Sequence, residues 1–310
     1  MVYVGIDVGG TGLKAGVVDE HGKIISKVSC PTGVERGHEA VIADMAQLAL
    51  KAIAESGYTL DDVKAIGIGI PGVQDPRTGR VPFCTNLGWH DVPVIELMQK
   101  VIDKPVYIDN DATVAALAES VAGVSSKYKD SIFLTLGTGV GGGVILNGKV
   151  YSGTHGVGSE LGHMIVVAGG DLCTCGNRGC WERYASATAL IRMGHECAAK
   201  HPESILAGKE KLNAKDVMDA AKANDPAGLE AFDQYTTYLA MGMVNIINFM
   251  DPEVIVLGGG VSAAGEFLLK PIREKLAKMV FYKAMPYARI ELATLGNDAG
   301  IIGAAMLGRI

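Results

Sequence analysis

The sequence predicts an α/β protein with mixed sheets in two lobes, and three observations lead to this fold class. The chain has 310 residues, more than one typical domain, so two lobes that share a cleft are expected. Apolar runs with strand character alternate with stripes of helical spacing along most of the chain. A strand, a glycine turn and a second strand open the chain, and the same plan recurs near its middle.

Composition and charge narrow the class of protein. The chain is 48% hydrophobic and 20% charged and contains 41 glycines, which is typical of a globular protein with many tight turns. Its net charge of −6 argues against a broad nucleic-acid interface. The sequence has no run of 18 apolar residues, and its first residues lack the pattern of a signal peptide. We therefore expect a soluble, cytoplasmic protein with no membrane or nucleic-acid partner.

The first part of the chain reads as three strands, a helix, a further strand, a short helix and a strand–helix pair. The helix that begins at His38 has an apolar stripe and ends before Gly57. The fourth strand stops at Pro71-Gly72, and a polar loop is expected from there to Trp89. The predicted strands are residues 2–8, 13–19, 23–30, 63–70 and 105–111, and the predicted helices are 38–56, 94–102 and 112–123.

The middle of the chain repeats its beginning. Residues 131–153 follow the plan of residues 3–25, with Asp7 aligned to Thr135 and Gly9 to Gly137, which suggests two related halves. Helices then dominate, and Asp225-Pro226 supplies an N-cap and a first-turn proline to the longest one. The remaining predicted helices are 185–200, 214–224, 226–250 and 298–310, and strands are expected within 252–262 and 288–295.

Two glycine hairpins are candidates for binding phosphate groups. In residues 7–14, glycines let backbone N–H groups approach an anion, Thr11 and Lys14 add donors, and Asp7 can hold a hydrated Mg²⁺. An ordinary glycine-rich hairpin is the alternative. The stretch Gly137–Gly142 matches G-x-G-x-x-G, but the apolar residues 143–148 that follow predict a strand, whereas a dinucleotide fold requires a helix. No P-loop motif is present.

Two further stretches lie where strands end and helices begin. The glycine turn at 257–262 can bring a base or sugar close to the backbone, or it can be a plain connection. At Asp109-Asn110-Asp111, either of the last two residues can cap the following helix. A carboxylate at this edge of a sheet can also accept a proton from a substrate hydroxyl, and Asp109 stays open as a second candidate.

The segment from residue 158 to residue 182 carries a set of soft-metal ligands. His163, Cys173, Cys175 and Cys180 supply one imidazole and three thiols, the ligand set of a closed structural zinc site. A redox or merely buried set of cysteines is the alternative, and the local glycines and the histidine favour zinc. Four protein ligands leave no position for a reactive water, so the zinc is expected to be structural. Glu160 and Glu182 bracket the ligands.

Together these motifs resemble the ROK family (repressor, open reading frame, kinase), and within it the bacterial ATP-dependent glucokinases most. The similarity spans essentially all 310 residues. ELGH followed by C-x-C-x4-C is highly specific, whereas each glycine motif alone is not. The matching motifs are DVGGTGLK at 7–14, GIPG at 69–72, DNDA at 109–112, LGTGVGGG at 136–143, GSELGH at 158–163, CTCGNRGCWE at 173–182 and LGGGVS at 257–262.

The resemblance implies an actin-like, ribonuclease H-like ATPase and sugar-kinase fold with mixed sheets flanked by helices. A small N-terminal lobe would comprise residues 1–117 with about 298–310, and a large lobe, 118–297, would carry the zinc segment. The implied activity is transfer of the γ-phosphoryl group of ATP, with Mg²⁺, to the 6-hydroxyl of glucose. Homodimers or homotetramers are common in the family, and this sequence does not distinguish between them.

The resemblance also implies roles for individual residues. Asp111 would be the general base, and zinc would be held by His163 and the three cysteines. The sugar-binding residues would be Gly72, Asn86, Asn110, Asp111, Glu160, His163 and Glu182. The residues on the side of ATP and its phosphates would be Asp7, Gly9, Gly10, Thr11, Lys14, Gly137, Thr138, Gly139, Gly258 and Gly259.

Several alternatives stay open at this stage. The substrate could be N-acetylmannosamine, N-acetylglucosamine, fructose or allose, and polyphosphate could replace ATP as the donor, although the 257–262 turn favours ATP. A non-catalytic sugar-sensing protein is a further alternative. A repressor is disfavoured because the chain begins at its first strand, and a DNA-binding region would be expected ahead of it.

Overall fold

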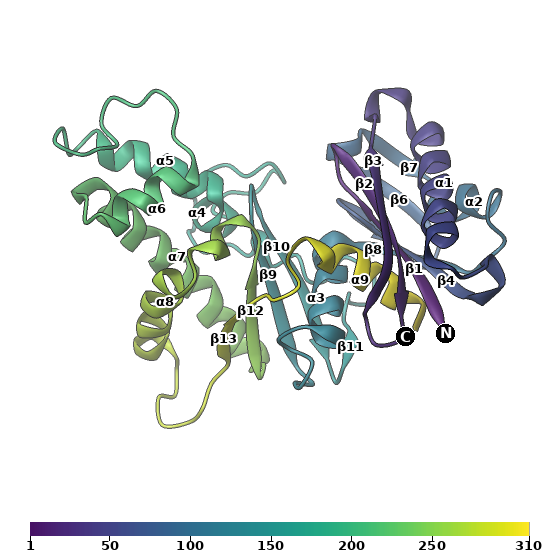
Figure 1. The fold of residues 1–310 in the computed structure, drawn as a ribbon. Helices are drawn as coiled ribbons and strands as arrows, with labels where there is room; N and C mark the ends of the chain where they lie inside the picture. Colours follow the sequence, from purple (N-terminus) through teal and green to yellow (C-terminus); the bar gives the residue numbers. More distant parts are fainter. Residues whose placement is uncertain (310) are drawn as a thin grey trace. The chain divides into compact units, whose positions relative to one another are not determined.

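The computed structural model describes residues 1–309, and the chain divides into two compact units (Figure 1). Unit 1 consists of Met1–Phe133, Gly143–Ser159 and Thr294–Ile310, and unit 2 consists of Leu134–Gly142 and Glu160–Ala293. The chain therefore passes between the units at four points. The kinase lobes expected from the sequence, with boundaries at 117 and about 298, stay a prediction.

The sheet of unit 1 has five strands in the order β3-β2-β1-β4-β8. The first hairpin pairs β1 with β2 antiparallel, whereas β1 pairs with β4, and β4 with β8, in parallel. In register, Asp7 lies beside Gly69 and Gly69 beside Asp109, so three parallel strands end at one edge of the sheet. The strands are β1 Val2–Val8, β2 Gly12–Asp19, β3 Ile24–Pro31, β4 Val63–Ile70 and β8 Val106–Asn110.

Helices cover both faces of this sheet because its side chains alternate along each strand. Val4 and Ile6 of β1 face the core formed with α1 (His38–Ser56) and α2 (Val94–Gln99). Tyr3, the residue before Val4, faces the second core formed with α3 (Asp111–Ala122) and α9 (Ala299–Met306). Gly57 follows α1 in the left-handed conformation, as predicted for the residue that ends this helix.

The C-terminal helix α9 lies unusually close to the sheet. A side chain on Gly5 of β1 would overlap the carbonyl oxygen of Ile301, and a side chain on Gly67 of β4 would overlap that of Ala304. Two sheet glycines therefore let the backbone of α9 rest directly on the backbone of β1 and β4.

A small third sheet occupies the segment for which the sequence predicted a polar loop, so that prediction is wrong. Its strands, in the order β5-β6-β7, are Val73–Asp75, Arg80–Cys84 and Trp89–Val92. Val81, Trp89 and Val92 are buried and join the core under α1. The sequence does not predict these strands because each is too short to show a period of two, and because glycines and prolines lie within and between them.

The second large sheet repeats the plan of the first. Its order is β11-β10-β9-β12-β13, which is the third, second, first, fourth and fifth strand in chain order, as in the sheet of unit 1. The internal repeat predicted from the glycine hairpins is therefore confirmed at the level of sheet topology. The strands are β9 Ser131–Leu136, β10 Val140–Leu146, β11 Lys149–Val150, β12 Val254–Gly258 and β13 Arg289–Leu292.

The helices of unit 2 follow the predicted stripes. The longest, α7 (Pro226–Met250), begins as expected, because the Asp225 side chain accepts from the Gly228 N–H and Pro226 stands in the first turn. The other helices are α4 Glu182–Ala185, α5 Ala187–Ala198, α6 Ala214–Lys222 and α8 Glu266–Met279. Single 3₁₀ turns in the two units lie at Val34–Arg36, Leu60–Asp62, Thr85–Leu87, Leu161–His163, Gly260–Ala264, Gly296–Asp298 and Leu307–Arg309.

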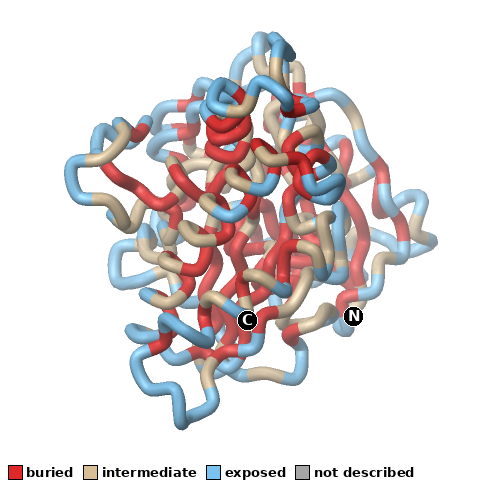
Figure 2. The backbone as a smooth tube through the Cα atoms, turned by 90° about the vertical axis from the view of Figure 1, so that its left-hand side faces the viewer, coloured by how far each residue is buried: buried red, intermediate tan, exposed pale blue. Residues whose placement is uncertain are grey.

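Burial follows this architecture. Figure 2 shows buried residues along the strands and the inner sides of the helices, with exposed residues concentrated in the connecting loops. Within residues 1–309, no helix combines the length and the apolar character needed to span a bilayer.

Candidate active site

The first glycine hairpin of unit 1 presents one acidic and one basic side chain. Asp7 near the end of β1 and Lys14 of β2 are partners in the strand register, and the Lys14 Nζ lies 3.2 Å from the Asp7 Oδ2. The turn between the strands is closed by a hydrogen bond of 2.9 Å from the Gly9 N–H to the Gly12 carbonyl. Thr32, which follows β3, also stabilises this turn, because its Oγ1 donates a hydrogen bond of 2.6 Å to the Gly9 carbonyl.

The carboxylate predicted as a base stands on the first residue of α3. Asn110 caps this helix, because its Oδ1 accepts from the Ala112 N–H at 2.8 Å, and its Nδ2 donates to the Gly72 carbonyl at 3.0 Å. Asn110, Asp111 and Gly72 are thus brought together in unit 1. Asn86 lies beside the first glycine hairpin, since a Cβ on Gly10 would be 3.5 Å from the Asn86 carbonyl oxygen.

The two aspartates at the end of β8 bind protons more readily than ordinary carboxylates. Burial raises the pKa of Asp111, and the negative charge of Asp7 raises it further. Neighbouring protein atoms crowd the Asp111 carboxylate, but the residue is still exposed to solvent, so a substrate can reach it. Burial also raises the pKa of Asp109 to about 6, against the opposing effect of the Asn110 N–H, which donates to its carboxylate at 2.7 Å.

The four predicted metal ligands converge in unit 2. The ligand atoms of His163, Cys173, Cys175 and Cys180 all lie within 4.8 Å of one another. The Cys173 Sγ is 3.7 Å from the His163 Nδ1, and the Cys175 Sγ is 3.6 Å from the Cys180 Sγ. All six cysteines of the chain are free thiols.

These distances fit a tetrahedral metal centre. Ligand atoms bound at about 2.1–2.3 Å to a common zinc ion lie about 3.6–3.8 Å apart along the edges of the tetrahedron. A disulfide would instead require sulfur atoms at about 2.05 Å. Burial and the neighbouring thiols raise the pKa of Cys180, so that a bound cation would be needed to stabilise three thiolates so close together.

The cluster also fixes the two glutamates that bracket it in the sequence. Glu182, the first residue of α4, accepts a hydrogen bond from the Cys173 thiol at 3.1 Å. The His163 Nε2, the nitrogen that faces away from Cys173, lies 4.0 Å from the Glu160 Oε2. A Cβ on Gly139 would be 2.5 Å from the Glu182 Oε2, so Glu182 links the cluster to the second glycine hairpin.

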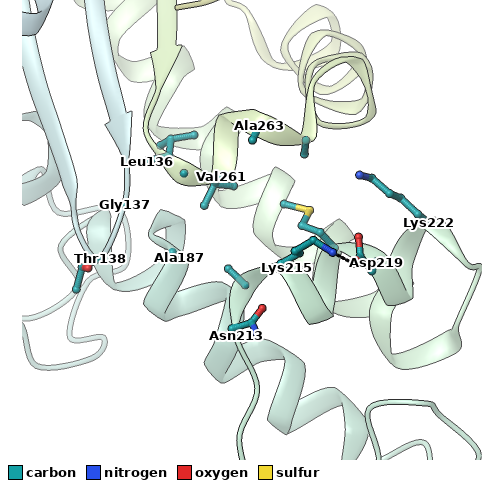
Figure 3. A pocket seen from close by; sticks show the side chains of 14 residues that line it. Leu136, Gly137, Thr138, Ala187, Asn213, Lys215, Asp219, Lys222, Val261 and Ala263 are labelled. Carbon is teal, nitrogen blue, oxygen red and sulfur yellow. Dashed lines mark hydrogen bonds and ion pairs between the residues drawn. The ribbon is translucent and has the colours of Figure 1, made fainter. Parts of the chain in front are cut away.

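The second glycine hairpin opens onto a cavity in unit 2 (Figure 3). The Ala187 N–H donates to the Gly137 carbonyl at 2.8 Å, and the Thr188 Oγ1 donates to the Thr138 carbonyl at 2.9 Å, so α5 holds the hairpin in place. The cavity has a volume of about 420 Å³ and a largely apolar wall. Its lining residues are Leu136, Gly137, Thr138, Ala187, Asn213, Ala214, Lys215, Met218, Asp219, Lys222, Gly260, Val261, Ala263 and Ala264.

One wall of this cavity was missed by sequence reasoning. Helix α6 contributes Lys215, Met218, Asp219 and Lys222, with Lys215 and Asp219 paired one turn apart. The helix itself was predicted from its spacing, but no motif in it indicates a ligand. The 257–262 turn reaches the cavity through Gly260 and Val261, the residues that follow the predicted Gly258 and Gly259.

Comparison with known proteins places the chain in a family. The model of the ROK family matches residues 3–309. The chain belongs to the ROK family. It is 39% identical to a glucokinase of Halalkalibacterium halodurans, over 98% of this chain and 94% of the relative. It is also 39% identical to a glucokinase of Thermotoga maritima, over 98% of this chain and 96% of the relative.

A solved structure shows the same fold. The ROK family glucokinase of Streptomyces griseus, in complex with glucose and AMPPNP, superimposes with a TM-score of 0.83 at 35% identity. The match covers 100% of this chain and 99% of that one. The family and the actin-like kinase fold predicted from the sequence are both confirmed.

Proposed function

We propose that the protein is an ATP-dependent glucokinase, which transfers the γ-phosphoryl group of ATP to the 6-hydroxyl of glucose. The observation that carries this conclusion is its similarity, over nearly the whole chain, to proteins named glucokinase. The activity is the one that the sequence motifs predicted. It agrees with the two features that phosphoryl transfer to an alcohol requires, an accessible carboxylate at Asp111 and glycine hairpins suited to phosphates.

We assign Asp111 as the general base. The 6-hydroxyl of glucose gives its proton to the Asp111 carboxylate as its oxygen forms a bond to the γ-phosphorus, and the bond from that phosphorus to ADP breaks. The raised pKa of Asp111 makes its carboxylate a stronger proton acceptor than that of an ordinary aspartate. Asn110 positions this carboxylate by capping α3 and by holding the Gly72 carbonyl.

We assign the sugar-binding groups in each unit by the chemistry of a neutral polyol. Many fixed donors and acceptors are needed to replace the water around its hydroxyls. In unit 1 these are Asn110, Asp111, Gly72 and Asn86, and in unit 2 they are Glu160, His163 and Glu182. The orientation of His163 supports this, because its Nδ1 faces the thiols and its Nε2 remains on the side of Glu160.

ATP, and not polyphosphate, is the donor that the cavity of unit 2 favours. An apolar wall formed by Leu136, Val261 and Met218 suits the face of a purine, and the cavity adjoins the hairpin of Gly137 and Thr138. A site for polyphosphate would need a row of unpaired cations, whereas Lys215 is paired with Asp219. Mg²⁺ carried with ATP would neutralise charge on the phosphates, and Asp7, Gly9, Gly10, Thr11 and Lys14 would lie on the phosphate side.

We further propose that the cluster of His163, Cys173, Cys175 and Cys180 holds a structural zinc ion. Its four ligands leave no open position, so the ion would shape the site without taking part in the transfer. Its contribution would be positional, because Glu182 contacts Cys173 and His163 approaches Glu160.

A kinase assay over glucose, fructose, allose, mannose, N-acetylglucosamine and N-acetylmannosamine, with ATP and polyphosphate as alternative donors, tests the proposal. We expect the highest kcat/KM with glucose and ATP. A higher kcat/KM with another sugar would change the substrate within the same reaction. No phosphorylation of any of these sugars would contradict the kinase assignment. The expectation of a homodimer or homotetramer stays a prediction.

A further inference from the structure

Helix α9 contacts both elements that carry the proposed carboxylates of unit 1. It rests on β1, which carries Asp7, through the contact of Gly5 with the Ile301 carbonyl. It rests equally closely on α3, which begins at Asp111, because a side chain on Gly303 would overlap the backbone at Val114. The C-terminal helix is thus packed, backbone against backbone, on the supports of both carboxylates.

The first turn of α9 meets Asp7 itself. A Cβ atom on Gly300 would lie 2.6 Å from the Asp7 Cγ and 2.8 Å from each carboxylate oxygen, closer than non-bonded atoms approach. The Lys14 Nζ lies 3.2 Å from Oδ2 of the same carboxylate. The Asp7 carboxylate therefore contacts a lysine and also lies against the bare backbone of Gly300.

The charge of the helix terminus suits this contact. The first N–H groups of a helix lack partners within the helix and carry partial positive charge, which stabilises a nearby carboxylate. Asp298 precedes α9 but its side chain does not cap the helix, and it pairs instead with the Lys27 Nζ at 2.6 Å. The Asp298 side chain therefore does not compete with Asp7 for the first turn of α9.

We propose that Gly300 is a positioning residue for Asp7. Because Gly300 has no side chain, the Asp7 carboxylate can lie against the first turn of α9, and in this position Asp7 contributes to binding of the Mg²⁺–ATP complex. This inference rests on the proposed ATP-dependent kinase function. A side chain at position 300 would overlap the Asp7 carboxylate, which would have to move from its place at the end of β1.

A double-mutant cycle between G300A and D7A tests this role. The affinity for AMPPNP with Mg²⁺ is measured by titration calorimetry, beside the affinity for glucose and the unfolding temperature. We expect G300A alone to weaken Mg·AMPPNP binding by about tenfold or more, with glucose binding changed by less than about threefold. In the D7A background the added methyl group meets no carboxylate, so G300A should then change Mg·AMPPNP binding by less than about twofold.

The matched control is I302V, which removes the terminal methyl group of a buried side chain on the same helix; the Cγ2 of this side chain, which valine keeps, lies near Gly22. It should lower the unfolding temperature and leave Mg·AMPPNP affinity unchanged. Equal losses of nucleotide affinity from G300A with and without Asp7, or an equal loss from I302V, would overturn the positioning role alone. A wild-type chain that does not bind Mg·AMPPNP would overturn both this inference and the proposed function.

Discussion

Glu119 is a buried carboxylate whose replacement should cost the protein much of its stability. It lies on α3 with no exposed surface and accepts four hydrogen bonds. The Oε1 accepts from the N–H groups of Thr294 and Leu295 at 2.8 and 2.9 Å. The Oε2 accepts from the Val124 N–H at 2.9 Å and from the Thr294 Oγ1 at 3.2 Å. These donors lie where α3 ends and where the chain re-enters unit 1.

The size of the effect of E119Q follows from this count. The amide keeps the shape of the side chain but replaces one oxygen with an NH2 group, so two of the four donors lose their acceptor. A hydrogen bond to a charged group contributes about 1.5–3 kcal/mol, so we expect the free energy of unfolding to fall by about 3–5 kcal/mol. That is a large part of the roughly 5–15 kcal/mol typical of a folded protein.

Urea unfolding followed by circular dichroism measures this loss. T294V is the matched control, because it removes only the hydroxyl donor at 3.2 Å and retains both N–H groups. We expect T294V to lower the free energy of unfolding by about 1 kcal/mol. If E119Q were as stable as T294V, the anchoring role of the Glu119 carboxylate would be refuted.

Three further predictions concern the proposed site. Elemental analysis should find about one zinc per chain, and C175S should lose the metal together with about tenfold or more of glucose affinity; full zinc content in C175S would contradict the ligand assignment. Because the pKa of Asp111 is raised and only the ionised carboxylate accepts a proton, kcat/KM for glucose should fall as the pH drops, starting above the usual range of an aspartate. The D109N variant should show the same fall of kcat/KM at low pH. If D109N did not show it, the group that titrates would be Asp109 and not Asp111. A263F should fill the cavity of unit 2 and raise KM for ATP about tenfold or more without changing glucose binding, and an unchanged KM would place the nucleotide elsewhere.

The sequence indicated the fold well where a periodic pattern continued over several turns or strand residues. The helix at His38–Ser56 and the helix at Pro226–Met250 have the predicted bounds, because a long apolar stripe and clear terminal residues define them. The repeated hairpins predicted related halves, and the two sheets share one strand order. The three short strands β5, β6 and β7 were missed because three to five residues are too few to show a period of two.

The candidate site was indicated only in part, for a different physical reason. The metal ligands are close in sequence, so their spacing alone predicts the cluster that the structure shows. The wall of the cavity on α6 and the contact between Gly300 and Asp7 join residues far apart in the chain. Such contacts depend on how helices pack against strands, and glycines that only make room for a neighbour leave no motif of their own.

The most direct test of the account is the turnover of D111N with glucose and ATP, measured beside its glucose affinity. We expect the wild-type protein to phosphorylate glucose, and we expect kcat of D111N to fall by about 10²–10⁴-fold while glucose binding changes by less than about threefold. Turnover of D111N close to that of the wild type would contradict the assignment of the Asp111 carboxylate as the base.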